Sequence, residues 1–471
     1  MLRPTLCAGA RHTLVPFAVR GTSFVTRQHV PGAGWSRREL LTGCGLAGGL
    51  ALAGCAEKAR PKILDQGAQV VSAPTAQVLK QILDRRAKAM EQGDERAFLA
   101  DLDQNNAELI KQQKILFANL RQFKPTTFRY ITYFTGDGIE EKGVHRFGPV
   151  HEVVQLEADA GPGGVSPAAT FQISAVQRGD QLVITELTRL TTGNGDKLGF
   201  SGLPATAPWY TTPLTVKRSG NVWLAGDASV TDLDRYAAPA EAEARGLEQM
   251  WGSRTRFPGH VLFFTKDEKN FATWFDFGGS DNFRPTFEGI EVPQYGVRQS
   301  GEVYLEQFAG SRIVVNLKQI GLFGDYPSRV MRHELAHAIT ARATVVNPGY
   351  WLLGAPRWAL EGFARWTEDR GDEMRRLAVG SFKGRLPTST NFYGKDIQYN
   401  YAVSSTAFTF VERIKGREAV VEFYESVVQH SDLDGEAVVD LPIFNAICTR
   451  VLKMSATDFK QRWATFVRTG A

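Results

Sequence analysis

The segment His333-Glu334-Leu335-Ala336-His337 holds two imidazoles and a carboxylate within five residues. Histidines four positions apart project from one face of a helix, one turn apart, so both can reach a single metal ion. Zinc accepts imidazole nitrogens at about 2.0 to 2.1 Å. Glu334 points slightly off that face, where a carboxylate can take a proton from water without occupying a coordination position. The spacing predicts His333 and His337 as zinc ligands and Glu334 as the general base of a hydrolysis.

A third ligand is expected on a second helix. A hydrolytic zinc site has three protein ligands and one open position, and beside two histidines the third is usually a carboxylate. Glu361 follows His337 at a helix-to-helix distance, inside the phrase Trp358-Ala359-Leu360-Glu361-Gly362-Phe363-Ala364. The alternative for Glu361 is a surface carboxylate that flanks a helix end.

The two phrases together resemble the gluzincin metallopeptidases, in particular the peptidase MA-like domains and, more distantly, the aminopeptidase N family. The similarity covers about residues 240–468. It implies that Glu361 is the third ligand of one Zn²⁺ per chain, on a helix that faces the first, and that the substrate is a peptide or protein. In these families a downstream tyrosine commonly hydrogen-bonds the oxyanion of the tetrahedral intermediate. Tyr401 matches that place; Tyr399 is the alternative, and both residues could instead pack at a helix start.

The sequence departs from the aminopeptidases in one respect. It contains no Gly-x-Met-Glu-Asn phrase of the kind that binds a free substrate amine there. An endopeptidase is therefore the expected activity. The strand 313–317 is the expected edge strand that would pair with an extended peptide, with an ordinary covered strand as the alternative.

The elements around the motif predict an α+β fold in two domains. Helices at 75–92, 94–102 and 106–120 precede strands at 128–134, 150–156, 169–176, 181–188 and 221–225, which predicts helices packed on one curved sheet over residues 75–230. This layout resembles the nuclear-transport-factor-like cone fold; the alternative role for it is a spacer or interaction module. The second domain, residues 240–471, is expected to be zincin-like, with helices at 240–251 and 268–275, a strand at 261–265, a hairpin formed by 301–307 and 311–319, and a mainly helical C-terminal part.

The amino-terminal region predicts export. At 471 residues the chain is long enough for two domains and a targeting segment. Arg37 and Arg38 precede an uncharged run that ends in Leu52-Ala53-Gly54-Cys55. This resembles a twin-arginine signal that leads into a bacterial lipoprotein box. It implies that residues 1–54 are removed, that a lipid on Cys55 anchors the protein at the extracytoplasmic face of the cell membrane, and that 55–74 form a tether. The alternatives are a buried helix or an uncleaved anchor.

Charge and cysteine content restrict the partners. Residues 1–54 hold six arginines and one glutamate, a net charge of +5 that equals the charge of the whole chain. The remainder is near neutral and has no basic tract, so nucleic acid is not an expected partner. Cys448 lies in an apolar segment without a nearby histidine, which is typical of a core residue.

We therefore expect an extracytoplasmic zinc-dependent endopeptidase. The alternative is a binding or assembly lipoprotein that retains a metallopeptidase fold without proteolysis. Hydrolysis of a non-peptide amide in the cell wall would use the same residues. The sequence does not indicate the cleavage specificity or the oligomeric state.

Overall fold

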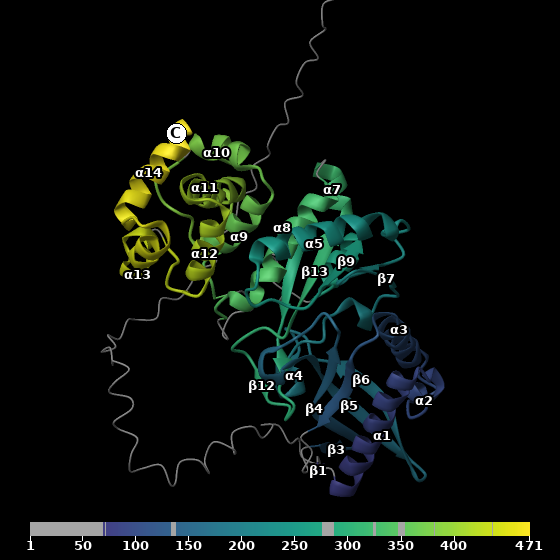
Figure 1. Ribbon diagram of the computed structural model, residues 1–471. Helices are drawn as coiled ribbons and strands as arrows, with labels where there is room; N and C mark the ends of the chain where they lie inside the picture. The colour runs from purple at the N-terminus through teal and green to yellow at the C-terminus, as the bar shows by residue number, and fades with distance from the viewer. Residues whose placement is uncertain are drawn as a thin grey trace, which may run out of the picture. The chain divides into compact units, whose positions relative to one another are not determined.

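The computed structural model describes residues 69–70, 72–132, 138–275, 287–323, 326–346, 354–380, 382–435 and 437–471. Within them the fold combines helices with two sheets, which confirms the predicted α+β class (Figure 1). The predicted export signal, with Arg37, Arg38 and Cys55, lies outside the described residues, so it stays a prediction. The last residues of the predicted tether belong to the fold, because Gln69–Val70 form strand β1 and helix α1 begins at Ala73.

The first helices begin at residues that suit helix starts. The side chains of Ser72, Asp94 and Asn106 each accept a hydrogen bond from a backbone N–H three residues ahead, which satisfies a donor that the first turn leaves open. Gly93 ends the first helix with a φ of 75°, a conformation that glycine adopts without strain. These helices, as predicted, are α1 (Ala73–Gln92), α2 (Glu95–Leu99) and α3 (Ala107–Phe123).

The first sheet has eight strands among the described residues. Its central strands β4 and β5 pair antiparallel, and β2 and β6 flank them. The predicted strands at 150–156, 169–176 and 181–188 are confirmed in β4, β5 and β6. The strands are β1, β2 (Thr127–Thr132), β3 (Ile139–Glu141), β4 (Val144–Gln155), β5 (Ser166–Arg178), β6 (Gln181–Arg189), β11 (Gly296–Val297) and β12 (Val303–Tyr304).

The strand predicted at 221–225 does not close this first sheet. It is β8 of a second sheet, where it pairs in parallel with β9. Val222 and Leu224 face one hydrophobic core and Trp223 and Ala225 face the other, so β8 needs cover on both faces and takes a central position. The second sheet runs in the order β10 (Gly289–Gln294), β13 (Gly310–Asn316), β9 (His260–Thr265), β8 (Val222–Gly226) and β7 (Thr215–Ser219).

The predicted hairpin at 301–307 and 311–319 is wrong. β12 joins the first sheet, whereas β13 lies between β10 and β9 in the second. Every residue of β13 is buried, and the strand pairs with a neighbour on each side, so the predicted edge strand at 313–317 is wrong. The edge strand beside it is β10. Each sheet thus includes strands from both predicted domains, and a boundary near residue 230 does not separate the sheets.

Beyond β13 the chain is mainly helical, as predicted. Helices α5 and α8 lie along the second sheet, and the later helices pack together around one large hydrophobic core (Figure 1). Cys448 is buried in this core, as its apolar neighbours predict. The helices not yet given are α4 (Gly195–Leu198), α5 (Ala237–Trp251), α6 (Glu268–Thr273), α7 (Leu317–Phe323), α8 (Pro327–Thr340), α9 (Arg357–Thr367), α10 (Gly371–Val379), α11 (Ile397–Lys415), α12 (Arg417–Val428), α13 (Pro442–Ile447) and α14 (Ala456–Thr469).

A buried ion pair joins the two sheets. The guanidinium of Arg312, on β13, donates to both carboxylate oxygens of Asp159, which follows β4, at 2.7 and 2.9 Å. Both side chains are 1% exposed. Asp159 also accepts a hydrogen bond from the backbone N–H of Leu156. The pair therefore connects the loop after β4 to the strand beside β10.

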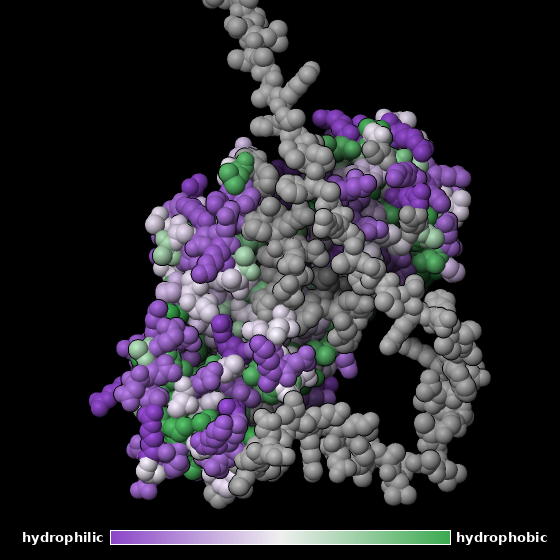
Figure 2. Space-filling model, turned by 180° about the vertical axis from the view of Figure 1, so that it is seen from behind, coloured by the Kyte–Doolittle hydropathy of each residue, from purple (hydrophilic) through white to green (hydrophobic). Residues whose placement is uncertain are grey.

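Hydrophilic residues predominate on the face of the molecule drawn in Figure 2, and hydrophobic residues are scattered among them. None of the helices in the described ranges has the length and apolar character needed to cross a bilayer.

We expect Asp159→Ala to lower the free energy of unfolding by about 3 to 5 kcal/mol, because it leaves the Arg312 guanidinium buried without a counter-charge. Urea unfolding followed by circular dichroism measures the change. Glu157→Ala is the control, since it removes the same charge from an exposed pair with Arg218 and should have a far smaller effect. Equal effects of the two variants would contradict the structural role of the buried pair.

Candidate metal centre

Helix α8 presents both histidines of the predicted zinc motif to one point. It begins at Pro327, where a missing N–H is tolerated because the first turn leaves that donor unpaired. His333 and His337 are both buried, and their Nε2 atoms lie 3.3 Å apart. The spacing of four residues therefore has the predicted consequence, with two imidazoles on the same face.

Helix α9 brings Glu361 to the same point. Its Oε2 atom lies 3.1 Å from His333 Nε2 and 3.4 Å from His337 Nε2. Four ligands at about 2.0 to 2.1 Å from a tetrahedral zinc ion lie about 3.3 Å from one another. The three side chains thus form a buried triangle of the size that such an ion requires, and among the described residues they are the group that could hold a metal.

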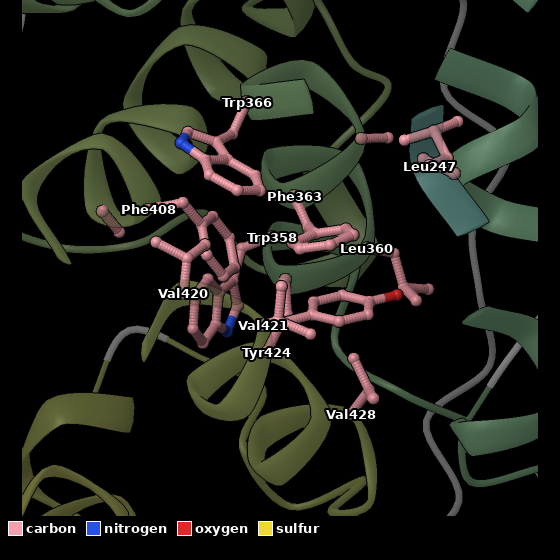
Figure 3. Close-up of a cluster of buried hydrophobic side chains, with 14 of the residues drawn as sticks. Leu247, Trp358, Leu360, Phe363, Trp366, Phe408, Val420, Val421, Tyr424 and Val428 are labelled. Carbon is pink, nitrogen blue, oxygen red and sulfur yellow. The ribbon is translucent and has the colours of Figure 1, made fainter. Parts of the chain in front are cut away.

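The residues after Glu361 fix helix α9 in place. A Cβ atom on Gly362 would lie 2.8 Å from the backbone of Ser404, so glycine is needed where α9 crosses α11. The Phe363 ring stacks on Tyr424 of α12, with ring centroids 3.9 Å apart. Figure 3 shows these two rings within a cluster of side chains from α9, α11 and α12. The packing explains why Glu361 is followed by Gly-Phe.

The electrostatics of the triangle favour a bound cation. Burial by itself would lower the pKa of His333, but its hydrogen bonds to Glu361 and Glu368 raise that pKa to about 10. Burial opposes the charge of Glu361, yet His337 and His333 hold its pKa well below the usual range. The same carboxylates that favour a proton on the imidazole also favour a metal ion, which would replace that proton.

A second carboxylate orients His333 from behind. Glu368 Oε1 lies 2.9 Å from His333 Nδ1, and the Glu368 side chain is 1% exposed. Arg365 donates to its other oxygen at 3.0 Å, and Arg329 lies 3.6 Å away. A carboxylate on Nδ1 fixes the ring so that Nε2 faces His337 and Glu361.

The Glu334 side chain extends from helix α8 toward the edge strand β10. A Cβ atom on Gly289 would lie 2.9 Å from Glu334 Cγ, so glycine permits the close approach of the strand. Burial raises the pKa of Glu334, against the effect of His333 and His337. A buried carboxylate with a raised pKa suits a group that must accept and return a proton.

The structure separates the two candidate tyrosines. The Tyr401 ring lies 6.0 Å from that of His333, centroid to centroid, and its hydroxyl makes no hydrogen bond to any described residue. Burial and the Glu361 carboxylate raise the pKa of Tyr401 well above its ordinary value, so the hydroxyl stays protonated and can donate. Tyr399 is near the backbone of Lys383 instead, away from the triangle.

The sequence analysis did not identify four further residues at the site. Tyr393 donates a hydrogen bond to Glu361 Oε1. Glu288 and Glu291 lie on or beside β10, and burial raises the pKa of Glu291 to about 7. Glu368 was also missed, although its position seven residues after Glu361 places it on the same helical face, two turns along. That spacing could have identified Glu368 from the sequence. The other three residues reach the site only through the tertiary fold.

We expect Glu368→Gln to weaken zinc binding by about 10- to 100-fold, because the His333 ring loses its charged partner. Competition with a chromogenic chelator measures the affinity. Glu373→Gln, which alters an exposed partner of Arg370, is the matched control. If both variants bind zinc with the same affinity, Glu368 does not support the site.

Comparisons with known proteins gave distant structural matches. No protein-family description matches the sequence, and no curated protein matches it at a significant level. Among solved structures, an M1 zinc metallopeptidase from Deinococcus radiodurans matches with 13% identity and a TM-score of 0.32, over 64% of this chain and 61% of that one. A two-domain M1 zinc metallopeptidase mutant bound to L-tryptophan matches with 14% identity and a TM-score of 0.31, over 64% and 61%. The chain thus spans less than two thirds of the length of these proteins, and similarity at this level does not establish a family.

Proposed function

We propose that the protein is a zinc-dependent peptidase whose metal is held by His333, His337 and Glu361. The observation that supports it is the buried triangle of ligand atoms, 3.1 to 3.4 Å apart, with Glu334 beside it. Two imidazoles and one carboxylate form the donor set of a hydrolytic zinc site that keeps one position open. Zinc bound there would polarise the scissile carbonyl and lower the pKa of water.

Three side chains of the protein carry out the proton transfer, the oxyanion stabilisation and the orientation of His333. Glu334 takes a proton from the attacking water and returns it to the leaving amine. Tyr401 donates its free hydroxyl to the oxyanion that develops at the carbonyl. Glu368 holds His333 in one orientation throughout, because its carboxylate stays on Nδ1.

The substrate would bind along β10. This strand pairs with β13 on one side, and no other described strand pairs with it. An extended peptide could therefore add to the sheet through backbone hydrogen bonds. We include endopeptidase activity in this proposal. Glu288 and Glu291, on this side of the site, offer carboxylates that could bind the free amine of an aminopeptidase substrate. Cleavage of peptides blocked at both ends distinguishes endopeptidase from aminopeptidase activity.

The place of action is also part of the proposal. The lipoprotein box at Cys55 and the arginine pair Arg37-Arg38 support an exported protein anchored by lipid. Hydrolysis would then take place at the extracytoplasmic face of the membrane.

The first test is the zinc content of purified residues 56–471. We expect about one zinc per chain, lost in His337→Ala and Glu361→Ala because each removes one of three ligands. Glu334→Gln should keep the metal and lose cleavage of a blocked peptide library, because the amide cannot accept the proton. A zinc content that Glu361→Ala does not change would disprove the three-ligand site. Bound zinc without any peptide cleavage by the wild type would favour the binding or assembly lipoprotein.

Tyr401→Phe should lower kcat by about 10²- to 10³-fold, because it removes one hydrogen-bond donor to the oxyanion. Tyr399→Phe removes the same hydroxyl two residues away and should have little effect. Peptide cleavage assays under saturating substrate compare the two. A large loss with Tyr399→Phe and none with Tyr401→Phe would reverse the assignment.

A further inference from the structure

One arginine beside the metal centre packs on a tyrosine that contacts the proposed third ligand. Arg357 and Glu361 are four residues apart on α9, so both project from the same face of the helix, one turn apart. The Arg357 guanidinium carbon lies 4.6 Å from the ring centroid of Tyr393, whose hydroxyl donates to Glu361. Arg357 is thus connected to the third ligand through a single tyrosine.

Arg357 contacts an aromatic ring rather than an acidic partner among the described residues. No carboxylate of the described residues forms an ion pair with it, whereas Arg329 and Arg365, on the His333 side, both lie against Glu368. Arg357 is also the first residue of α9, and a cation at a helix N-terminus is opposed by the helix dipole. A half-buried guanidinium in such a place, without a counter-charge among the described residues, is available to an external anion.

We propose that Arg357, stacked on Tyr393, binds a carboxylate of the peptide substrate and gives the site a preference for acidic peptides. Guanidinium groups bind carboxylates through two parallel hydrogen bonds, and the aromatic ring holds the fork in one plane. This inference rests on the proposed peptidase function, because it names the substrate class of that site.

The position of Arg357 limits which carboxylate it can reach. One helical turn rises about 5.4 Å, and an extended peptide advances about 3.3 Å per residue. The carboxylate therefore belongs within about two residues of the scissile bond. It is either the side chain of Glu or Asp or the free α-carboxylate of a peptide cut near its C-terminus.

Binding to the zinc-loaded Glu334→Gln protein tests the inference without turnover. The probes are a fluorescein-labelled alanine hexapeptide with a free or an amidated C-terminus, and amidated hexapeptides with one internal Glu or Gln. Fluorescence anisotropy should show at least about tenfold tighter binding of one carboxylate form over its amide. The first pair detects the α-carboxylate and the second pair detects the acidic side chain.

Adding Arg357→Gln should bring the acid-to-amide affinity ratio to about one. Arg376→Gln on the exposed face of α10 makes the same charge change and should keep the ratio. Circular dichroism and zinc content verify that each variant is folded. Equal affinities for both forms, or a ratio that Arg357→Gln does not change, would overturn the proposal. A carboxylate preference in a protein whose wild type cleaves no peptide would keep the subsite and reject the peptidase.

Discussion

The site depends on one constraint, the burial of two imidazoles and a carboxylate within 3.4 Å of one another. Buried charge is costly unless a counter-charge or hydrogen bonds compensate for it. Glu361 and Glu368 carry negative charge against His333, so the group favours one added cation. A proton on His333 supplies part of this positive charge, whereas a divalent ion would supply it to all three side chains at once. The packing around the group can be understood as the means of keeping these atoms together.

Two helices and one strand provide that packing. Arg332 of α8 donates to the backbone oxygen of Thr367 at the end of α9 and to Glu243 of α5, which joins the two ligand helices to each other and to the second sheet. Thr340 and the Tyr424 hydroxyl, 2.8 Å apart, connect α8 to α12. Glycine is used where the elements approach most closely, at Gly362 beside α11 and at Gly289 beside Glu334. The absence of a side chain at these crossings allows Glu361 and Glu334 to reach one point.

The arginines around the site differ in whether a carboxylate pairs with them. Toward His333, the arginines Arg329 and Arg365 are paired with Glu368, and Glu288 lies near them. Toward Tyr393, Arg357 has no carboxylate partner among the described residues. A peptide that lay along β10 would meet carboxylates and one guanidinium that has no carboxylate partner among the described residues. This asymmetry is a source of orientation and specificity that does not depend on the metal.

The sequence by itself determined the parts that depend on local spacing. Histidines four apart share a helical face wherever the helix lies, and the Glu-Gly-Phe phrase marked Glu361 before its helix was placed. The α+β class and most helices and strands followed from periodicity. Only the tertiary structure decided that β8 and β13 are central strands, that β10 is the edge, and that Tyr401 rather than Tyr399 faces His333. These features, like the positions of Gly289 and Tyr393, arise from contacts between residues far apart in the chain, which hydrophobic periodicity cannot specify because it reports that a face is buried and not what covers it.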